Sequence, residues 1–193
     1  MRIGVLGAKR IMNPYIKNLR KIEFVEVNNV SRFLFKQMTM EDVPVYADII
    51  FSILAENMSV IAPTGNSYDE DYKIWLGFFE AALRENRNHI ILAFYDETLC
   101  GYFQYSFHGT TFRMEEIQFK PEYQGSGLFA ELYRHLIPMI PEHIISVDAF
   151  ARKENKKSQE ILKHLGLTVI GENKNGKSLH FKGDYKTLSE RYS

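Results

Sequence analysis

The sequence has little of several features that mark specialised classes of protein. Cys100 is the one cysteine among 193 residues, so an internal disulfide is excluded. The 24 lysines and arginines balance 24 aspartates and glutamates, so the total charge favours neither a nucleic acid nor an anionic membrane as partner. The longest apolar stretches, such as 49–55, fall short of the ~20 apolar residues that cross a bilayer. The N-terminus lacks the apolar core of a secretory signal. Together with the lone cysteine and the short apolar stretches, this indicates a cytoplasmic protein.

The composition is that of a globular chain with a substantial core. Hydrophobic residues make up 45% and aromatic residues 13% of the sequence, and this length favours one domain. We predict an N-terminal extension over 1–29, packed on a domain that spans 30–193. We expect no metal site, because the histidines lack the close pairing and nearby cysteines of zinc ligands; they stand at 89, 108, 135, 143, 164 and 180.

Hydrophobic periodicity predicts an α/β domain with helices early and late and strands between. Thr39 and Asp42 resemble a capping box at the start of an apolar helix that runs to about Asn57. A second helix ends near Asn86. The remaining predictions are a strand at 33–38, three strands of an antiparallel meander at 89–94, 99–107 and 112–119, a helix from Gly127 to Pro138, a strand at 144–150, a helix at 154–165 and a final hairpin of 167–170 with 179–182.

The segment after the strand at 112–119 has the pattern of an anion-binding turn. Gln124-Gly125-Ser126-Gly127-Leu128 opens a helix, and the first N–H groups of a helix have no partner within the helix. The helix dipole adds attraction for negative charge. The alternative is an ordinary turn with Ser126 as the helix cap, and glycines alone would favour that alternative.

Two motifs resemble the GNAT N-acetyltransferase superfamily. The run Pro121-Glu122-Tyr123-Gln124-Gly125-Ser126-Gly127 resembles the segment that holds the pyrophosphate of acetyl-CoA, whose pattern is Gln or Arg, two residues, Gly, one residue, then Gly or Ala. Phe129 stands where that pattern wants a small residue. Asn155 heads a helix that closes with Leu165-Gly166-Leu167, similar to the family's later segment, and Leu162 occupies the place where the family often has a tyrosine.

This resemblance implies a GNAT-like fold with a mixed, mostly antiparallel sheet flanked by helices. It also implies direct attack of an amine on the acetyl thioester, with backbone N–H groups polarising the carbonyl. The acceptor would be a small-molecule or peptide amine, without nucleic acid, membrane or metal, and a homodimer is expected because such domains commonly pair. The residues implied to bind acetyl-CoA are Ile117, Gln118, Phe119, Gln124, Gly125, Ser126, Gly127, Leu128, Phe129 and Asn155.

Glu115 and Glu116 are the candidates for the general base. An alkylammonium with a pKa near ~10.4 must lose a proton before it attacks, so a base within reach is useful. Successive strand residues face opposite ways, so we expect one glutamate to face the cleft and favour Glu115, which would share a face with Ile117. The alternative is that both are solvated sheet residues.

Other residues have a functional and a structural interpretation. The resemblance makes the loop 58–67 and Tyr68, Tyr72 and Trp75 an acceptor pocket wall, while helix capping is the simpler account of the acidic run 69–71. Cys100 fits core packing better than a nucleophile, and His164 is expected to face solvent. A basic cluster near the expected cofactor site could meet a CoA phosphate or simply be solvated: Arg152, Lys153, Lys156 and Lys157.

Two rival functions remain open. Phe129 and Leu162 depart from the family pattern, so a GNAT-like module that binds acyl-CoA or docks a partner without turnover is the alternative to an enzyme. Residues 1–8 look like the first strand of a dinucleotide-binding fold, but the full Gly-x-Gly-x-x-Gly does not follow. A structural strand is therefore the better interpretation of that segment.

Overall fold

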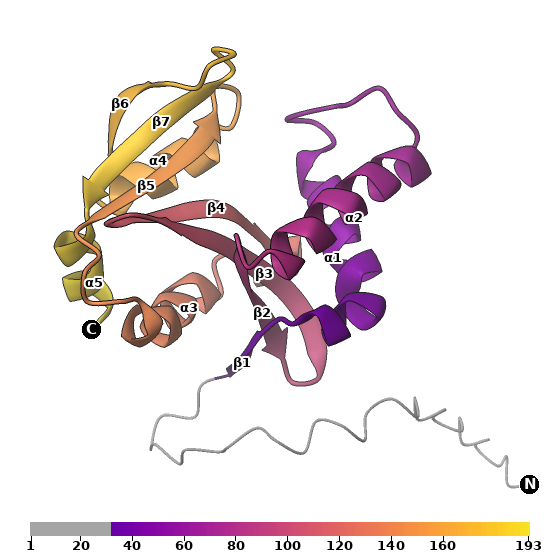
Figure 1. The fold of residues 1–193 in the computed structure, drawn as a ribbon, viewed down its shortest axis with the longest axis horizontal. Coiled ribbons are helices and arrows are strands. Elements are labelled where there is room, and N and C mark those ends of the chain that lie inside the picture. Colours follow the sequence, from indigo (N-terminus) through magenta and orange to yellow (C-terminus); the bar gives the residue numbers. More distant parts are fainter. Residues whose placement is uncertain (1–31) are drawn as a thin grey trace, which may run out of the picture. The chain divides into compact units, whose positions relative to one another are not determined.

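A seven-stranded sheet forms the centre of the fold (Figure 1). The computed structural model describes residues 32–193, and the predicted extension, 1–29, lies outside the described residues. The strand order is β1-β2-β3-β4-β5-β7-β6, and only β4 and β5 run parallel among the neighbours, which confirms the expected mixed sheet. The strands are β1 (Phe33–Gln37), β2 (His89–Tyr95), β3 (Thr98–His108), β4 (Thr111–Phe119), β5 (Ser146–Arg152), β6 (Thr168–Glu172) and β7 (Ser178–Asp184).

Helices cover the sheet close to where hydrophobic periodicity predicts them. Their bounds are α1 (Val43–Met58), α2 (Tyr68–Arg84), α3 (Leu128–Leu136), α4 (Lys156–His164) and α5 (Tyr185–Tyr192), with short 3₁₀ helices η2 (Met40–Asp42), η3 (Pro121–Tyr123) and η4 (Ile137–Met139). The expected capping interaction is present, because the Thr39 N–H donates to the Asp42 carboxylate at 3.0 Å. Within residues 32–193, no helix combines the length and apolar character needed to cross a membrane.

Sequence reasoning missed helix α5. Its N-terminus is capped by Asp184, whose carboxylate accepts a hydrogen bond from the Lys186 N–H at 2.7 Å. Leu188 is fully buried, and the Tyr192 ring stacks on Tyr133 of α3 at 5.1 Å. A capping aspartate with apolar residues four and eight positions later is a helical signal. That signal was available in the sequence.

Two apolar cores lie on opposite faces of the sheet (Figure 1). On one face, α1 and α2 pack on β2 and β3 through residues such as Ile50, Leu92 and Tyr102. On the other face, α3, α4 and α5 pack on β3, β4 and β5 around Phe103 and Phe112. The central strands are buried on both faces because helices cover both, which explains their nearly continuous apolar runs.

Strands β4 and β5 separate partway along their length. Their parallel pairing runs from Thr111 with Ser146 to Met114 with Ala149 and stops there. Beside this point β4 carries a β-bulge, because Glu116 pairs with Gln104 and Met114 with Tyr105, which leaves Glu115 as the extra residue. A bulge bends a strand and disrupts pairing locally. Beyond it, β4 continues to pair with β3 and β5 with β7, so an opening forms between them.

A buried carboxylate ties the paired part of β4 to β5 and β7. Asp148 on β5 is 3% exposed and accepts two hydrogen bonds from the Arg113 guanidinium, at 2.7 and 2.9 Å. His180 Nε2 on β7 lies 2.9 Å from the same carboxylate. Burial acts to raise the pKa of Asp148, but the hydrogen bonds and charges of Arg113 and His180 outweigh it and hold the pKa below its usual value.

Asp148→Asn is expected to lower the free energy of unfolding by about 3 kcal/mol at neutral pH, because Arg113 would lose its carboxylate partner in a buried position. Since the folded pKa is depressed, this stability is present above the unfolded pKa of ~3.9 and is lost as pH falls through the folded value. Urea unfolding of both proteins between pH 3 and 7 measures the difference.

Glu160→Gln is the control for that measurement, because it removes an exposed pair with Lys163 on α4. Exposed pairs contribute ~0–1 kcal/mol, so this variant should unfold close to the wild-type midpoint. Equal midpoints for Asp148→Asn and Glu160→Gln would contradict a structural role for the buried carboxylate.

Candidate functional site

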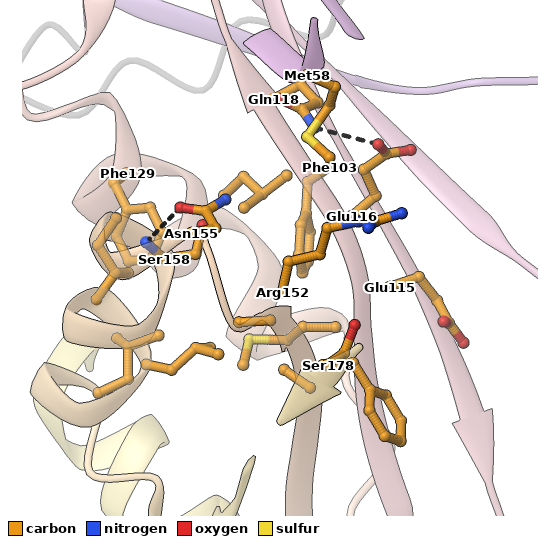
Figure 2. Close-up of a pocket in the computed structure, with 18 of the residues that line it drawn as sticks. Met58, Phe103, Glu115, Glu116, Gln118, Phe129, Arg152, Asn155, Ser158 and Ser178 are labelled. Carbon is orange, nitrogen blue, oxygen red and sulfur yellow. Dashed lines mark hydrogen bonds between the residues drawn. The ribbon is translucent and has the colours of Figure 1, made fainter. Parts of the chain in front are cut away.

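Three pockets meet where β4 and β5 separate. A central pocket of about 190 Å³ lies between the two strands (Figure 2). A second pocket, which we call the turn groove, extends from it along the end of β4 to the turn before α3. A third, which we call the helical pocket, lies between α1, α2 and their connecting loop. Met58, at the end of α1, lines all three. The pockets therefore adjoin one another, from the turn, past the open strand edges, to the helices.

The predicted anion-binding turn has the geometry that its glycines suggest. Gly125 and Gly127 have φ angles of 84° and 91°, in the left-handed region that favours glycine. A Cβ added at either would meet no atom within 4 Å, so the turn is open on that side. Gly127 is the N-cap of α3, and the Ser126 hydroxyl donates to the Tyr123 carbonyl at 2.6 Å. At this turn the groove is therefore bordered by the backbone of Gly125 and by Phe129 in the first turn of α3.

Gln124 links this turn to β4 and to α4. Its Nε2 donates to the Phe119 carbonyl at 3.0 Å, and Lys157 Nζ hydrogen-bonds to its Oε1. Lys157 borders the turn groove, so it adds positive charge beside the anion-binding turn. In the basic cluster, Lys153 instead pairs with Glu172 at 2.7 Å, and Arg152 lines the central and helical pockets.

The end of β4 supplies an unpaired backbone edge to the opening. Ile117, Gln118 and Phe119 line the turn groove, as expected of residues that would bind a cofactor. The Phe119 carbonyl points to this edge, where side-chain amides of Asn57 and Gln124 donate to it. On the other side of the strand, Gly101 of β3 pairs with Phe119, and a Cβ at Gly101 would lie 2.4 Å from the Gln118 carbonyl oxygen. Glycine is therefore required for this close approach.

The two glutamates do not alternate as expected. The bulge places the Glu115 and Glu116 side chains on the α1 and α2 face, whereas Ile117 packs in the core on the other face. Both glutamates line the central pocket, so the expectation that only one would face the cleft is wrong. The physical reason is the extra residue, which breaks the two-residue period of the strand.

Glu115 and Glu116 differ in their surroundings (Figure 2). The Glu115 carboxylate accepts a hydrogen bond from Ser106 Oγ, and its side chain is 31% exposed. The Glu116 carboxylate accepts one from Gln118 Nε2 at 3.1 Å. Burial raises the pKa of Glu116 above its usual value, and the hydrogen bond from Gln118 offsets part of that rise. Glu116 is therefore the more buried of the two glutamates.

Asn155, Phe129 and Leu162 form the wall opposite β4. Asn155 Oδ1 caps α4 by accepting the Ser158 N–H at 3.0 Å (Figure 2). The Phe129 ring packs on Tyr133 at 4.8 Å and lines both the central pocket and the turn groove. Leu162, at the place of the family's frequent tyrosine, is buried and lines the central pocket. This wall is mainly apolar and offers no proton donor at that place.

The helical pocket contains part of the expected acceptor wall. Tyr68 and Trp75 line it, whereas Tyr72 does not. A hydrogen bond to Asp48, followed by burial, raises the pKa of Tyr72 to about 12. Asp71 lines the pocket and accepts hydrogen bonds from Thr64 and Asn66, which tie down the connecting loop; these bonds lower its pKa.

Two candidates from the sequence have structural roles. Cys100 is fully buried, its Sγ donates to the Ala93 carbonyl at 3.2 Å, and burial raises its thiol pKa to about 11. A thiol with so high a pKa is a poor nucleophile. His164 is exposed on α4, as predicted. In the described part of the chain, no three His, Cys, Asp or Glu side chains are grouped to hold a metal ion.

Sequence reasoning missed two features of these pockets: Asn57, and the place of Arg152 in the pocket wall. Asn57 continues the inward face of α1 that carries Ile50 and Ile53, which are buried. Their spacing of three and four residues was visible in the sequence. What the spacing could not indicate is that the last turn of α1 reaches the edge of β4.

The fold and the pockets together define a class. An open mixed sheet, separated between two parallel strands and followed by an anion-binding turn at a helix N-terminus, is the architecture of the GNAT fold. A model of the acetyltransferase (GNAT) family matches residues 49–167. The chain therefore belongs to the GNAT family and is an acetyltransferase of that family.

Solved structures share this fold at low sequence identity. PaiA N-acetyltransferase from Thermoplasma acidophilum, in complex with coenzyme A, is 15% identical over 80% of this chain and 100% of that chain, with a TM-score of 0.59. Ribosomal-protein-S5-alanine acetyltransferase from Vibrio fischeri is 18% identical over 80% and 93%, with a TM-score of 0.57. Spermidine/spermine N-acetyltransferase SpeG from Vibrio cholerae is 13% identical over 84% and 99%, with a TM-score of 0.57. Among curated proteins, none matches the sequence.

Proposed function

We propose that this protein transfers the acetyl group of acetyl-CoA to a primary amine by direct attack of the amine on the thioester. The observation that carries the proposal is a path of three adjoining pockets from the glycine turn, along the free edge of β4, to the helices. A long cofactor can lie along one part of such a path while an acceptor enters from the other. The reacting carbon would then lie between β4 and β5.

The residues of the turn groove fit acetyl-CoA. The open backbone at Gly125, together with the Lys157 charge, suits the pyrophosphate, and Gly127 opens α3 beside it. The free edge at Ile117 to Phe119 suits the pantetheine amides, which need backbone partners, and the apolar wall at Phe129 suits the alkyl parts. The resemblance further implies contacts from Ser126, Leu128 and Asn155. When bound, acetyl-CoA would supply an activated acyl group, so a covalent enzyme intermediate is not needed.

Glu116 is the general base that the geometry favours. It lines the central pocket, and its raised pKa brings a carboxylate closer to the basicity needed to accept a proton from an ammonium group, directly or through water. Glu115, favoured from the sequence, is more exposed and is held by Ser106. Backbone N–H groups at the free edge of β4 would polarise the thioester carbonyl.

The acceptor class remains an amine of small-molecule or peptide origin. Two of the similar structures are of proteins named for amine substrates, the alanine of ribosomal protein S5 and spermidine or spermine. The helical pocket supports an amine acceptor, because its aromatic side chains Tyr68 and Trp75 and the carboxylate of Asp71 favour a cation.

Acetyl-CoA is expected to bind the purified protein in isothermal titration, whereas NAD is not. The turn follows a strand of a mostly antiparallel sheet, so the described residues 32–193 lack the doubly wound parallel sheet on which a dinucleotide binds. Binding of both ligands would indicate a general anion site. Absence of acetyl-CoA binding would reject the proposed function.

A non-catalytic acyl-CoA-binding or partner-docking module is the second candidate. Leu162 supports it, because a leucine lines the central pocket where the family often has a tyrosine. Release of free CoA thiol in the presence of a panel of primary amines distinguishes the two. Binding of acetyl-CoA without thiol release with any amine of the panel would favour the module.

A further inference from the structure

A chain of side-chain amides leads from the backbone of β4 to Glu116. Asn57 Nδ2, on the last turn of α1, donates to the Phe119 carbonyl at 3.0 Å and to Gln118 Oε1 at 2.9 Å. Gln118 Nε2 then donates to Glu116 Oε1 at 3.1 Å (Figure 2). Asn57 and Gln118 border the turn groove, and Gln118 and Glu116 border the central pocket. The chain therefore runs along the wall of the proposed site.

The direction of this chain is fixed at one end. A backbone carbonyl can only accept, so the group that Asn57 turns toward Phe119 has to be its NH₂ and not its oxygen. The same NH₂ carries a second proton, which goes to Gln118, so Gln118 has to present its oxygen to Asn57. The Gln118 NH₂ is then left on the side of Glu116. Each amide is thus oriented by the one before it.

We propose that Asn57 is a positioning residue that holds the Gln118 side-chain amide with its donor, rather than its acceptor, facing the carboxylate of Glu116. A glutamine amide has two orientations of nearly the same shape, and only hydrogen-bond partners select between them. Without Asn57, Gln118 can turn its oxygen toward Glu116. The Glu116 carboxylate would then lose its hydrogen bond and be repelled by the side-chain oxygen of Gln118.

The consequence is for the protonation of Glu116. Burial favours its neutral form, and the N–H of Gln118 opposes that effect by favouring the charged form, so this bond lowers the pKa. The other titratable or charged groups around Glu116 are Tyr102 on β3, Glu115 on β4 and Arg152 on β5. From α1, the neighbours are Asn57 and Met58, and neither ionises. Asn57 thus acts on Glu116 through Gln118.

The test measures the pKa of Glu116 by ¹³C NMR of the side-chain carboxyl in full-length protein, with the signal assigned by its loss in Glu116→Gln. Asn57→Leu removes the donors without adding charge. Asn57→Asp replaces them with a group that only accepts, and so attracts the Gln118 NH₂. Both variants are expected to raise the pKa of Glu116, by on the order of one pH unit for Asn57→Asp.

The same substitutions are then made in a Gln118→Leu protein, because the chain of amides no longer reaches Glu116 when Gln118 is absent. In this background Asn57→Leu should not move the Glu116 pKa further, and Asn57→Asp should raise it only by direct repulsion between the two carboxylates, which is less than its effect when Gln118 is present. Gln124→Leu is the matched control, since it removes the other amide donor to the Phe119 carbonyl without touching Gln118. An unchanged Glu116 pKa in Asn57→Asp, or an equal rise in the Gln118→Leu background, would overturn the proposal. If Asn57→Leu fails to fold, the Glu116 pKa in Asn57→Asp, measured with and without Gln118, tests the proposal by itself.

The inference rests on the proposed function only for the use that is made of Glu116, and the two can fail separately. If the pKa of Glu116 responds to Asn57 as expected but Glu116→Gln retains full thiol release, the positioning role of Asn57 is supported and Glu116 is not the base. If Glu116→Gln is inactive but the Glu116 pKa is unchanged by substitutions at Asn57, Glu116 is supported as the base and Asn57 is not a positioning residue.

Discussion

Glu116→Gln is expected to lower kcat about 10²- to 10⁴-fold at neutral pH, the range that positioned general bases contribute. Glutamine keeps the shape of the side chain and an acceptor for Gln118 Nε2 but cannot take a proton from the amine. The affinity for acetyl-CoA should change little, because the turn and the edge of β4 are untouched. Rates of CoA thiol release and titration with acetyl-CoA measure the two effects.

The pH dependence adds a second signature to this variant. A base must be deprotonated, so wild-type activity should fall as pH falls through the apparent pKa of Glu116, which lies above the ordinary value of 4.5. Glu116→Gln should lose this acid limb.

Glu115→Gln is the control, since Glu115 lies next in the chain and lines the same pocket. Glutamine there can still accept the Ser106 hydrogen bond. If the two variants lose activity equally, or neither does, Glu116 is not a distinct base.

Gly127→Asp is expected to weaken acetyl-CoA binding about 10- to 100-fold relative to Gly127→Asn, or ~1.4–2.8 kcal/mol. Gly127 opens α3 at a φ of 91°, and asparagine and aspartate are among the residues that best tolerate that conformation. Both side chains have the same shape and would extend into open space. The difference between the two variants therefore isolates the repulsion between a carboxylate and the pyrophosphate.

Titration of both variants with acetyl-CoA at two salt concentrations makes this measurement. The difference in Kd should shrink at high salt, because an exposed interaction between charges is screened. Thermal unfolding of the two variants controls for backbone strain and should give similar midpoints. Equal affinities of Gly127→Asp and Gly127→Asn would place the pyrophosphate away from this turn.

Most of the fold was predictable from local patterns. The strands β2, β3 and β4 begin and end within one or two residues of the apolar runs that predicted them, because alternating or continuous apolar residues between turns specify strands directly. The start of α2 is similarly local: Ser67 and Glu70 form a capping box. Helix α5 was not predicted because it is short, at eight residues, and mostly polar.

The site was predictable only in part. The glycine turn at Gly125 and Gly127 was predicted because turn chemistry and helix capping depend on neighbours in sequence. The facing of Glu115 was predicted wrongly, because the bulge that turns it depends on how β4 pairs with β3. Asn57 was missed because its partners, Gln118 and Phe119, lie about sixty residues away in the sequence.

The sequence by itself determined the order of the elements, the anion-binding turn and the resemblance to acetyltransferases, because periodicity, capping and glycine conformation are set by residues close together in the chain. The tertiary structure alone decided where β4 and β5 part, which glutamate is the more buried, and that α1 orients Gln118. These features depend on strand register and on contacts between distant segments. No local pattern fixes such contacts, since each is selected by the packing of the whole sheet.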